Sequence, residues 1–433
     1  MELYDRYKEC NCSVTTDSRS IKGGEMFFAL RGENFDGNDY AVKALENGAG
    51  LAVVNSDADL PDDPRLIRVE DPLKALQELA VYHREHVRGD KRLPVIGLTG
   101  TNGKTTTKEL INAVLSGKFK VTATRGNQNN DIGVPLSLLD IRPDTEIAVI
   151  EMGASHPDDI AKLVKVSRPD FGLITNVGKA HLLGFGSFEG VKAAKGELYN
   201  WLGAHDGSVI FLNADDPDLR EMASKQPCHC FEYGIAYQGA EILPSSPEEP
   251  FLKLKLDGDV ISTKLVGSYN ANNVLAAICI GDWFGVPRKD SIAAIEAYVP
   301  SNNRSQMSRT ADNTLVIDAY NANPSSMNAA LENFRTIISD KKVALLGDMR
   351  ELGADSLKEH IKVVRQLKGM DIDAFFVGEE FRKALEADGD GDFRWFPDSA
   401  RLACYLKENP IKKAVVLIKG SRGIQMEKAI PEL

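Results

Sequence analysis

The chain has 433 residues, of which 43% are hydrophobic and 27% are charged, as in an ordinary soluble globular protein. This length allows two to four domains with sizeable cores. The chain has 63 acidic residues against 52 lysines and arginines, which gives a net charge of −11. This balance argues against nonspecific binding to nucleic acid or to an anionic membrane, because both require a basic surface.

Two further features concern the cellular compartment. No uninterrupted run approaches the roughly 20 apolar residues of a membrane span, and the N-terminus MELYDRYKEC lacks the apolar core of a secretory signal. The six cysteines are sparse for this length, which is typical of a reducing environment. We therefore expect a cytoplasmic protein without a membrane span.

Short apolar runs separated by glycine and aspartate mark the first section of the chain. Met26–Leu30 and Ala49–Val54 are typical of short strands, and Pro72–Val87 has the pattern of a helix. The charged segment Arg88–Arg92 has the composition of a linker. These features predict a first domain over residues 1–88.

In the rest of the chain, short apolar runs alternate with helical patterns. The first such runs are Val95–Thr99, Ala148–Met152 and Phe171–Val177. This alternation predicts a mostly parallel sheet that is covered by helices on both faces. The polar stretch Arg309–Thr314 precedes a second series of the same kind. We expect an α/β protein with a central domain over residues 89–310 and a C-terminal Rossmann-like domain over residues 311–433.

The strongest local signal is a glycine-rich turn between an apolar run and a helical pattern. This is the context that a phosphate-binding loop requires. Backbone amides at the start of the helix can cradle phosphates, Lys104 can neutralise the β- and γ-phosphates, and Thr105 can place its hydroxyl on Mg²⁺. We expect nucleotide contacts from Gly100, Thr101, Asn102, Gly103, Lys104, Thr105 and Thr106.

One position departs from the strict phosphate-loop pattern. The pattern G-x4-G-K-[ST] requires a glycine at position 98, where this chain has Leu98. The alternative interpretation is a glycine-rich turn that merely ends in Gly-Lys-Thr. The strand before the turn and the helix after it favour nucleotide binding.

The segment Gly100–Thr106 resembles the phosphate loop of the Mur ligase family, the ATP-dependent amide-forming ligases of peptidoglycan synthesis. Further segments resemble that family in the same order and cover all three expected domains. They are Asp17–Arg19, Asn127–Asn130, Glu151–Gly153, Thr175–Val177 with His181, Lys195–Glu197, Asn270–Asn273 and Asn302–Arg304. The resemblance implies an N-terminal UDP-binding domain, a central P-loop ATPase domain and a Rossmann-like C-terminal domain.

Four segments resemble the branch of the family that joins D-alanyl-D-alanine to UDP-N-acetylmuramoyl-tripeptide (UDP-MurNAc-tripeptide). They are Gly126–Asn130, Asp318–Pro324, Leu346–Gly353 and Lys419–Gly423. This resemblance implies that ATP phosphorylates the terminal carboxylate of the tripeptide and that the amine of D-Ala-D-Ala attacks the acyl phosphate. Phosphate would then leave from a tetrahedral intermediate, giving the UDP-MurNAc-pentapeptide precursor of peptidoglycan.

Three alternatives stay open. The chain could be a related ligase that adds a different amino acid, a P-loop ATPase or kinase without a ligase role, or a binding protein without catalysis. Relatives that add a diamino acid have a D-N-P-R element in the last domain, and this sequence lacks it.

For the nucleotide, the resemblance implies five contacts. Lys104 and Arg304 would contact the γ-phosphate of ATP, and Asn273 would lie near adenine. Asp318 and Asn321 would contact the ribose and the phosphates. Asparagine-rich segments also form turns readily, so a purely structural role is the alternative for both asparagines.

For metals, the resemblance implies two Mg²⁺ sites. Thr105 and Glu151 would form the first, since Mg²⁺ prefers oxygen ligands, and His181 would contribute to the second. Lys195 matches a lysine that sister ligases carbamylate with CO₂, which turns the amine into a carboxylate-like ligand. That reaction needs a neutral amine and therefore a lowered pKa. The alternatives are a strand-end carboxylate, a capping histidine and a surface lysine without catalytic roles.

For the substrates, the resemblance implies UDP contacts from Ser18 and Arg19, and contacts to the peptide or its reacting carboxylate from Asn129 and Asn130. The expected catalytic residues are Lys104, Asn130, His181, Lys195 and Arg304. The dipeptide would be bound by Asp348, Arg350, Lys419, Ser421 and Arg422, although charged loops are commonly just solvated.

The resemblance also implies a monomer. Substrates of this size must meet between the domains, so we expect domain closure with Arg88–Arg92 and Arg309–Thr314 as hinges.

Overall fold

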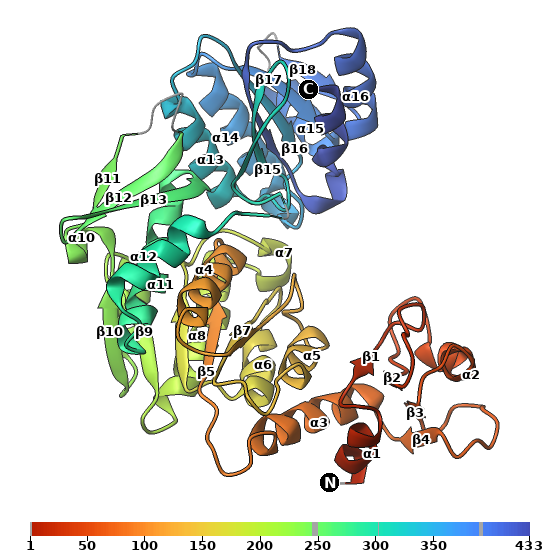
Figure 1. The fold of residues 1–433 in the computed structure, drawn as a ribbon. Helices are drawn as coiled ribbons and strands as arrows, with labels where there is room; N and C mark the ends of the chain where they lie inside the picture. Colours follow the sequence, from red (N-terminus) through yellow and green to blue (C-terminus); the bar gives the residue numbers. More distant parts are fainter. Residues whose placement is uncertain (1, 245–249, 302, 389–392) are drawn as a thin grey trace.

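The computed structural model describes residues 2–244, 250–301, 303–388 and 393–433. Asn302, from the segment expected around Arg304, lies outside these ranges. The strands within them form four sheets. Figure 1 shows three lobes, with the N-terminal lobe in red, the central lobe in orange to green and the C-terminal lobe in blue.

The N-terminal lobe is a small α/β unit. It contains β1 (Val14–Thr15), β2 (Met26–Phe28), β3 (Leu51–Asn55) and β4 (Leu66–Val69), with α1 (Glu2–Glu9), α2 (Ala41–Glu46) and α3 (Pro72–His86). The four strands are parallel and lie in sequence order. Every residue of β2 and β3 is buried, as expected for the apolar runs of the sequence.

The central lobe is built on a six-stranded sheet. Its strands are β5 (Val95–Thr99), β6 (Val121–Ala123), β7 (Ile147–Glu151), β8 (Phe171–Ile174), β9 (Val209–Asn213) and β10 (His229–Tyr233). Its helices are α4 (Lys104–Ser116), α5 (Gly133–Leu139), α6 (Asp159–Ser167), α7 (Leu182–Phe185), α8 (Phe188–Gly203), α9 (Pro217–Ser224), α10 (Ile235–Gln238), α11 (Ala271–Trp283) and α12 (Arg288–Ala297). All six strands are parallel, in the order β10-β9-β8-β5-β7-β6, so the expected parallel sheet is confirmed.

Both faces of this sheet are covered by helices. Along β7, Ala148 and Ile150 pack in one cluster with residues of α5, α6 and α8. Val149 points the other way and packs with residues of α4 and α11. This alternation is the period of a strand, and burial on both faces explains why β7 is apolar up to its last residue, Glu151.

A small antiparallel sheet follows the central sheet along the chain. It consists of β11 (Glu241–Leu243), β12 (Phe251–Leu256) and β13 (Asp259–Val266), in that order. Figure 1 shows this sheet beside the C-terminal lobe.

The C-terminal lobe has a second six-stranded sheet. It contains β14 (Gln306–Arg309), β15 (Thr314–Asp318), β16 (Lys342–Gly347), β17 (Asp373–Val377), β18 (Arg394–Phe396) and β19 (Val415–Lys419), with α13 (Pro324–Thr336), α14 (Ser356–Lys368), α15 (Glu379–Asp388) and α16 (Ser399–Glu408). The order is β14-β15-β19-β16-β17-β18, and all pairs except β14-β15 are parallel. Because β14 pairs with β15, this sheet begins ahead of the boundary expected at residue 310.

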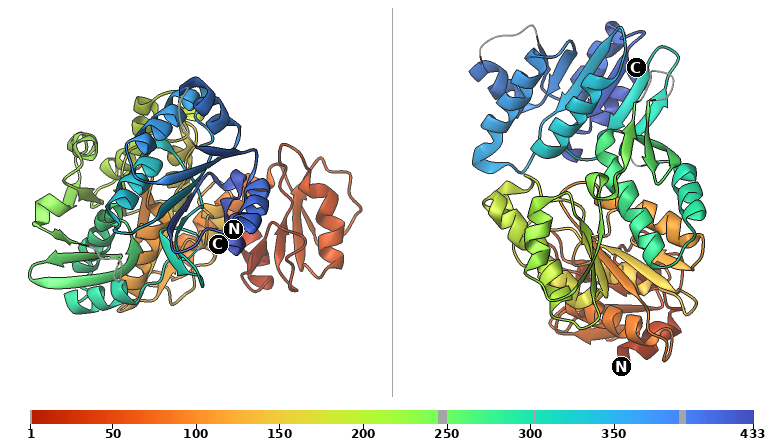
Figure 2. Two further views of the ribbon diagram at one scale, coloured as in Figure 1. Left: turned by 90° about the horizontal axis from the view of Figure 1, so that it is seen from above. Right: turned by 90° about the vertical axis from the view of Figure 1, so that its left-hand side faces the viewer.

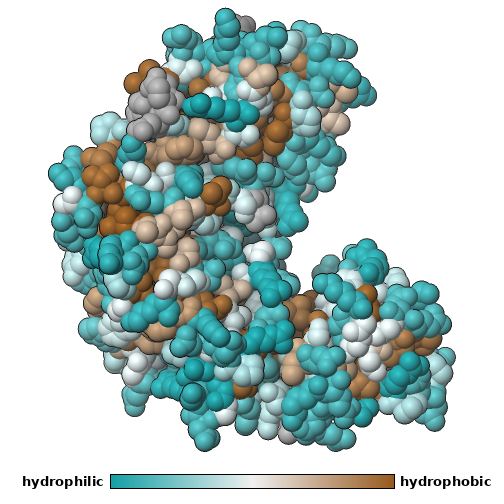
Figure 3. All heavy atoms as spheres, in the orientation of Figure 1, coloured by the Kyte–Doolittle hydropathy of each residue, from teal (hydrophilic) through white to brown (hydrophobic). Residues whose placement is uncertain are grey.

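The N-terminal lobe projects to one side of the other two (Figure 2). The space-filling view shows a wide hollow between it and the C-terminal lobe (Figure 3). Among the described residues, no helix combines the length and the apolar character that crossing a bilayer requires.

Helices α1 and α3 fasten the N-terminal lobe to the central lobe. The hydroxyl of Tyr7 donates to the carbonyl of Leu139 at 3.1 Å. Asp170, just before β8, pairs with Arg84 of α3 at 3.3 Å and also with Arg92. The segment expected to act as a hinge is therefore tied to the central lobe at Arg92.

Candidate active site

The glycine-rich loop joins β5 to α4 and has the backbone that a phosphate loop needs. Gly100 has φ +140° and Gly103 has φ +79°, a region that L-residues with side chains rarely adopt. A Cβ at Gly100 would lie 2.0 Å from Oγ1 of Thr175. Leu98, where the strict pattern has a glycine, is fully buried within β5. It contributes to the core rather than to the loop.

Lys104 is the first residue of α4 and folds back on the loop. Its Nζ donates to the carbonyls of Gly100 at 2.7 Å and Thr101 at 3.1 Å. The pKa of Lys104 is lowered to about 8, mainly by burial; the charge of Glu151 opposes this change and that of Arg304 adds to it. An incoming polyphosphate would supply the missing negative charge and favour the ammonium form.

Glu151 lies at the carboxyl end of β7, beside the helix that begins with Lys104. The hydroxyl of Thr105 donates to both carboxylate oxygens, at 3.0 and 3.2 Å, and Nδ2 of Asn129 donates to Oε1 at 2.8 Å. The carboxylate is only 1% exposed. A buried carboxylate in contact with a hydroxyl fits Mg²⁺, which takes few protein oxygens and keeps several waters.

Lys195 lies on α8 and is almost fully buried, with Nζ 3.3 Å from the carbonyl of Ala154 and 5.3 Å from the ring centre of Phe185. Burial, reinforced by the charge of Lys104, lowers the pKa of Lys195 to about 7. A large fraction of this amine is therefore neutral near pH 7, which is the form that reacts with CO₂. This environment fits a carbamylated lysine.

His181 precedes α7 in a left-handed conformation, with φ +51°. Its Nδ1 contacts the carboxylate of Glu351 from the C-terminal lobe. Burial lowers the pKa of His181, while Glu351 opposes that shift. The neutral imidazole that burial favours is the form able to bind a metal ion.

The C-terminal lobe supplies a buried ion pair at the ends of two neighbouring strands. Lys419, the last residue of β19, is 1% exposed and donates to Oδ2 of Asp318 at 2.6 Å. It also donates to the carbonyl of Asn321 at 3.3 Å. Asp318 ends β15, so both side chains lie at the carboxyl edge of the sheet, where open α/β sheets bind ligands.

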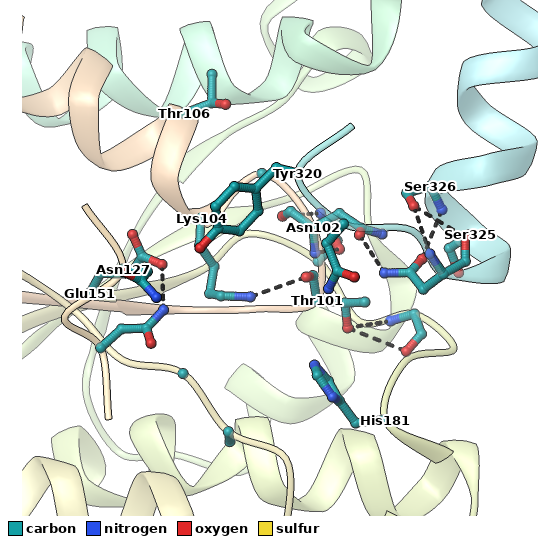
Figure 4. A pocket seen from close by; sticks show the side chains of 18 of the residues that line it. Thr101, Asn102, Lys104, Thr106, Asn127, Glu151, His181, Tyr320, Ser325 and Ser326 are labelled. Carbon is teal, nitrogen blue, oxygen red and sulfur yellow. Dashed lines mark hydrogen bonds between the residues drawn. The ribbon is translucent and has the colours of Figure 1, made fainter. Parts of the chain in front are cut away.

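These elements surround a cavity of about 800 Å³ between the central and C-terminal lobes. Figure 4 shows Lys104, Glu151, His181 and Tyr320 around it. The structure brings together the following predicted site residues as its lining: Thr101, Asn102, Gly103, Lys104, Thr106, Asn129, Asn130, Glu151, His181, Asn273, Arg304, Asp318, Asn321 and Lys419. Thr105 and Lys195 lie just behind this lining, through their contacts with Glu151 and Ala154.

The predicted UDP residues lie outside the cavity lining. Arg19 is in the N-terminal lobe, its side chain is 88% exposed, and it pairs with Asp17 at 2.9 Å. Neither Arg19 nor its neighbour Ser18 lines the cavity. In this arrangement of the lobes, the residues expected to bind UDP are therefore separated from the cavity expected to bind the reacting end of the same substrate.

Asp348 is also outside the cavity lining, and its carboxylate has structural partners. It accepts from the backbone amides of Glu380 at 3.0 Å and Phe381 at 2.9 Å, in the first turn of α15. Ser421 accepts from the amide of Arg350 at 2.9 Å, so the two predicted dipeptide loops contact each other. The remaining predicted dipeptide residue outside the lining is Arg422.

Several lining residues that the sequence analysis did not name lie in segments that it singled out, and two of them make contacts with distant parts of the chain. Asn323 donates through Nδ2 to Oδ1 of Asn102 at 2.8 Å, which joins the phosphate loop to the C-terminal lobe. Tyr320 stacks on the guanidinium of Arg304 at 3.6 Å. The composition of Asp318–Pro324 indicated a binding site. It did not indicate which side chains would contact distant parts of the chain.

Comparisons with known proteins agree with this geometry. Profiles of three Mur ligase domains match the chain: "Mur ligase family, catalytic domain" over residues 13–84, "Mur ligase middle domain" over 98–281 and "Mur ligase, glutamate ligase domain" over 303–422. The UDP-N-acetylmuramoyl-tripeptide–D-alanyl-D-alanine ligase of Bacillus subtilis is 35% identical, over 97% of this chain and 92% of that protein.

Solved structures are similar over the same extent. MurF from Acinetobacter baumannii has a TM-score of 0.85 at 30% identity, covering 97% of this chain and 93% of that one. MurF from Thermotoga maritima, in complex with ADP, has a TM-score of 0.82 at 27% identity, covering 97% and 96%. The three-domain α/β architecture expected from the sequence is confirmed, and the chain belongs to the Mur ligase family.

Proposed function

We propose that this protein is an ATP-dependent ligase that joins D-Ala-D-Ala to UDP-MurNAc-tripeptide and makes the UDP-MurNAc-pentapeptide precursor of peptidoglycan. The observation that supports it most is the cavity between the central and C-terminal lobes, where a phosphate loop faces a second set of cations. The relatives that share nearly the whole length of the chain are named for this reaction.

The first step of this reaction is an electrostatic problem, because an anionic carboxylate must approach the anionic γ-phosphate of ATP. Lys104 and Arg304 both line the cavity and are the proposed γ-phosphate cations. The backbone amides after Gly100 add further donors at the start of α4. Fixed positive groups of this kind stabilise charge that develops during phosphoryl transfer without having to reorganise.

The second step needs the acyl phosphate and the incoming amine to be held together and away from water. Asn130 lines the cavity and uses its Oδ1 to accept from the amide of Gly133 at 2.8 Å. Its Nδ2 is therefore the group left to hold a carboxylate. We assign Asn129 and Asn130 to the reacting end of the tripeptide, and Lys419 to the side from which D-Ala-D-Ala arrives.

Two Mg²⁺ sites belong to this proposal. Thr105 and Glu151 would hold the first, and His181 with a carbamylated Lys195 would hold the second. Bound Mg²⁺ would neutralise phosphate charge and orient the γ-phosphoryl group. Support comes from the hydroxyl–carboxylate contact at the first site and from the lowered pKa of the buried amine at the second.

The outer parts of the substrates are assigned to residues away from the cavity. Ser18 and Arg19 would contact UDP once the N-terminal lobe approaches. Asp348, Arg350, Ser421 and Arg422 would contribute to the dipeptide site, with Asp348 acting through α15 rather than by direct contact. Adenine would lie near Asn273, and ribose and phosphates near Asp318 and Asn321.

We also propose three domains with limits near residues 88 and 310, the second moved to just before β14 (Gln306–Arg309) because that strand pairs with β15, together with a monomeric state and a cytoplasmic location. All six cysteines are free thiols, as a reducing compartment would leave them.

A direct test is the choice of amino donor. The full-length protein is incubated with ATP, Mg²⁺ and an equal mixture of UDP-MurNAc-tripeptide and the UDP-MurNAc-dipeptide that lacks its third residue, together with equal amounts of D-Ala-D-Ala, lysine and diaminopimelate, and the products are identified by mass spectrometry. The proposal predicts a single product that carries D-Ala-D-Ala. A product that carries a diamino acid would replace it with a related ligase activity.

A further inference from the structure

Two arginines share one aromatic ring at the wall of the cavity. Tyr320 lies two residues after the end of β15 and lines the cavity. The guanidinium carbon of Arg304 is 3.6 Å from the centre of its ring, and that of Arg422 is 5.4 Å away. Nη1 of Arg422 also lies 3.4 Å from the hydroxyl of Tyr320, to which it donates.

Among the ion pairs of the described residues, none involves Arg304 or Arg422, so no acid in that part of the chain neutralises either guanidinium. Arg304 also has a buried Nε without a hydrogen-bond partner in the part of the chain that the structure describes. Another Arg–Tyr contact lies away from the cavity, where the guanidinium carbon of Arg394 is 5.1 Å from the ring centre of Tyr405.

A ring holds an arginine differently from a carboxylate. The negative face of the π-system attracts the guanidinium and fixes its plane, but it adds no net charge to the site. A carboxylate at the same place would fix Arg304 as well and would cancel the charge that an anionic ligand needs. Stacking on Tyr320 therefore orders the side chain of Arg304 and leaves its positive charge available.

We propose that Tyr320 is the positioning residue that holds Arg304 for the γ-phosphate of ATP. This inference rests on the proposed function, since it assigns a γ-phosphate to the cavity. The ring face is the part that matters for Arg304, because a separation of 3.6 Å is van der Waals contact and leaves no room for a nucleotide base on that face.

The test compares nucleotides that differ only in the γ-phosphate. Calorimetric affinities for ADP and for a non-hydrolysable ATP analogue are measured with Mg²⁺ on the full-length protein and on three variants. Tyr320→Leu is expected to weaken binding of the analogue by about tenfold and of ADP by less than about twofold. Tyr320→Phe keeps the ring and is expected to bind both nucleotides within about twofold of the unchanged protein. Tyr405→Leu is the matched control, which removes an Arg–Tyr contact away from the cavity and leaves both affinities unchanged.

A double variant separates positioning from general disturbance of the fold. In an Arg304→Met background, Tyr320→Leu should cost no further analogue affinity, because the cation that it positions is gone. Equal losses for ADP and the analogue would overturn the inference and assign the ring to the nucleoside or the β-phosphate. An unchanged analogue affinity in Tyr320→Leu would overturn it as well.

These binding measurements need no acceptor substrate, so they stay separate from the proposed ligase activity. If the protein proves to add a different amino acid, the proposed function fails, while the difference between the losses of analogue affinity and ADP affinity still tests Tyr320. If ligation of D-Ala-D-Ala is found and this difference is absent, only the inference about Tyr320 fails.

Discussion

At the scale of single residues, burial tunes two lysines of the cavity region in the same direction. Lys104 and Lys195 both have a lowered pKa, near 8 and near 7, and burial is the main cause for each. Lys192, one turn earlier on α8, pairs with Asp218 and Glu221, and these hydrogen bonds raise its pKa. The pKa of a lysine is therefore shifted in opposite directions on the same helix. Burial lowers it at Lys195, whereas hydrogen bonds to carboxylates raise it at Lys192.

The lowered pKa of Lys104 predicts proton uptake when ATP binds. At pH 8.5 part of the free protein has a neutral Lys104, and the phosphates favour the charged form, so binding should take up a fraction of a proton. Apparent affinity should fall as the pH rises above 8. Calorimetry in buffers of different ionisation enthalpy measures this uptake. Lys104→Arg stays charged and should abolish it, whereas equal uptake in both proteins would contradict the assignment.

Lys195 provides a second prediction. Lys195→Ala should lower ligase activity by about 100-fold, as expected for the loss of a group that supports a metal site. Lys192→Ala is the matched control on the same helix and should retain activity. Brief acid treatment should inactivate the unchanged protein, and bicarbonate above pH 7, where the amine is mostly neutral, should partly restore it. Full activity of Lys195→Ala would rule out carbamylation as a requirement.

The residues that could be predicted from sequence are those whose role is local. Gly100 and Gly103 are needed by the backbone of one turn, and Glu151 follows an apolar run that can only be a buried strand. The partners of Tyr320 and Asn323 could not be predicted, because the first contact joins two separate loops and the second depends on how two lobes meet. A pattern of neighbours along the chain contains no information on that geometry.

At the scale of elements, α13 connects nucleotide binding to the C-terminal lobe. Asn323 caps this helix by accepting from the amide of Ser326 at 2.9 Å, and the same side chain donates to Asn102 in the phosphate loop. One residue thus begins a helix and holds the loop of another lobe. The two roles use different atoms, so they can be separated by substitution.

Asn323→Ser should separate them. Serine caps helices about as well as asparagine, so the thermal stability of the C-terminal lobe should be nearly unchanged. The shorter side chain cannot reach Asn102, so KM for ATP should rise several-fold as the loop loses that donor. Steady-state kinetics with a parallel melting curve measures both. A large drop in stability with an unchanged KM would mean that the contact between the lobes does not support the loop.

Helix α15 gives a prediction for Asp348. Its carboxylate accepts two backbone amides at the start of that helix and is 5% exposed. Asp348→Ala should therefore lower the stability of the C-terminal lobe by about 2 kcal/mol, as expected for a lost cap in a buried setting. The KM for D-Ala-D-Ala, measured at a temperature where the variant is folded, should change little. A large rise in this KM without loss of stability would make Asp348 a direct dipeptide contact.

The order of strands could be predicted only in part. Alternating apolar runs predicted two parallel sheets correctly, since buried strands on both faces have a clear signature. β14 has none of that signature, because its four residues Gln306–Arg309 are polar or half-buried, and it joins the C-terminal sheet by antiparallel pairing at the edge. Only the pairing with β15 shows to which lobe this segment belongs.

At the scale of the whole molecule, the open hollow beside the N-terminal lobe implies motion during catalysis. Arg19 and the cavity are expected to bind opposite ends of one substrate, yet Arg19 belongs to the N-terminal lobe and does not line the cavity. Figure 3 shows the hollow between that lobe and the C-terminal lobe. Helices α1 and α3 contact the central lobe and also share an apolar core with β2 and β3, so closing the hollow would move the N-terminal lobe as one unit. Arg92, the last residue of the segment expected to act as a hinge, pairs with Asp170 through a side chain that is 78% exposed, so the hinge at 88–92 stays a prediction.

This arrangement predicts a more compact molecule when both ligands are bound. Small-angle scattering should give a smaller radius of gyration with a non-hydrolysable ATP analogue and UDP-MurNAc-tripeptide together than with either one alone. Arg19→Ala should weaken the change that depends on the UDP compound. An unchanged radius with both ligands would mean that the lobes stay as they are and that the substrate spans the hollow.

The net charge of −11 excluded partners that bind a basic surface, but it could not identify the ligand. ATP and UDP-MurNAc-tripeptide are anions, so the acidic bulk of the molecule does not attract either nucleotide substrate. Binding must rest on a few placed cations: Lys104 and Arg304 line the cavity without an acidic ion-pair partner among the described residues, whereas Lys419 is already paired with Asp318.

The most direct test of the central claim is phosphate release measured with each substrate omitted in turn. The proposed ligase predicts release only when ATP, UDP-MurNAc-tripeptide and D-Ala-D-Ala are all present, with one phosphate formed for each pentapeptide. Sustained release without D-Ala-D-Ala would contradict the account and make the protein an ATPase or kinase instead.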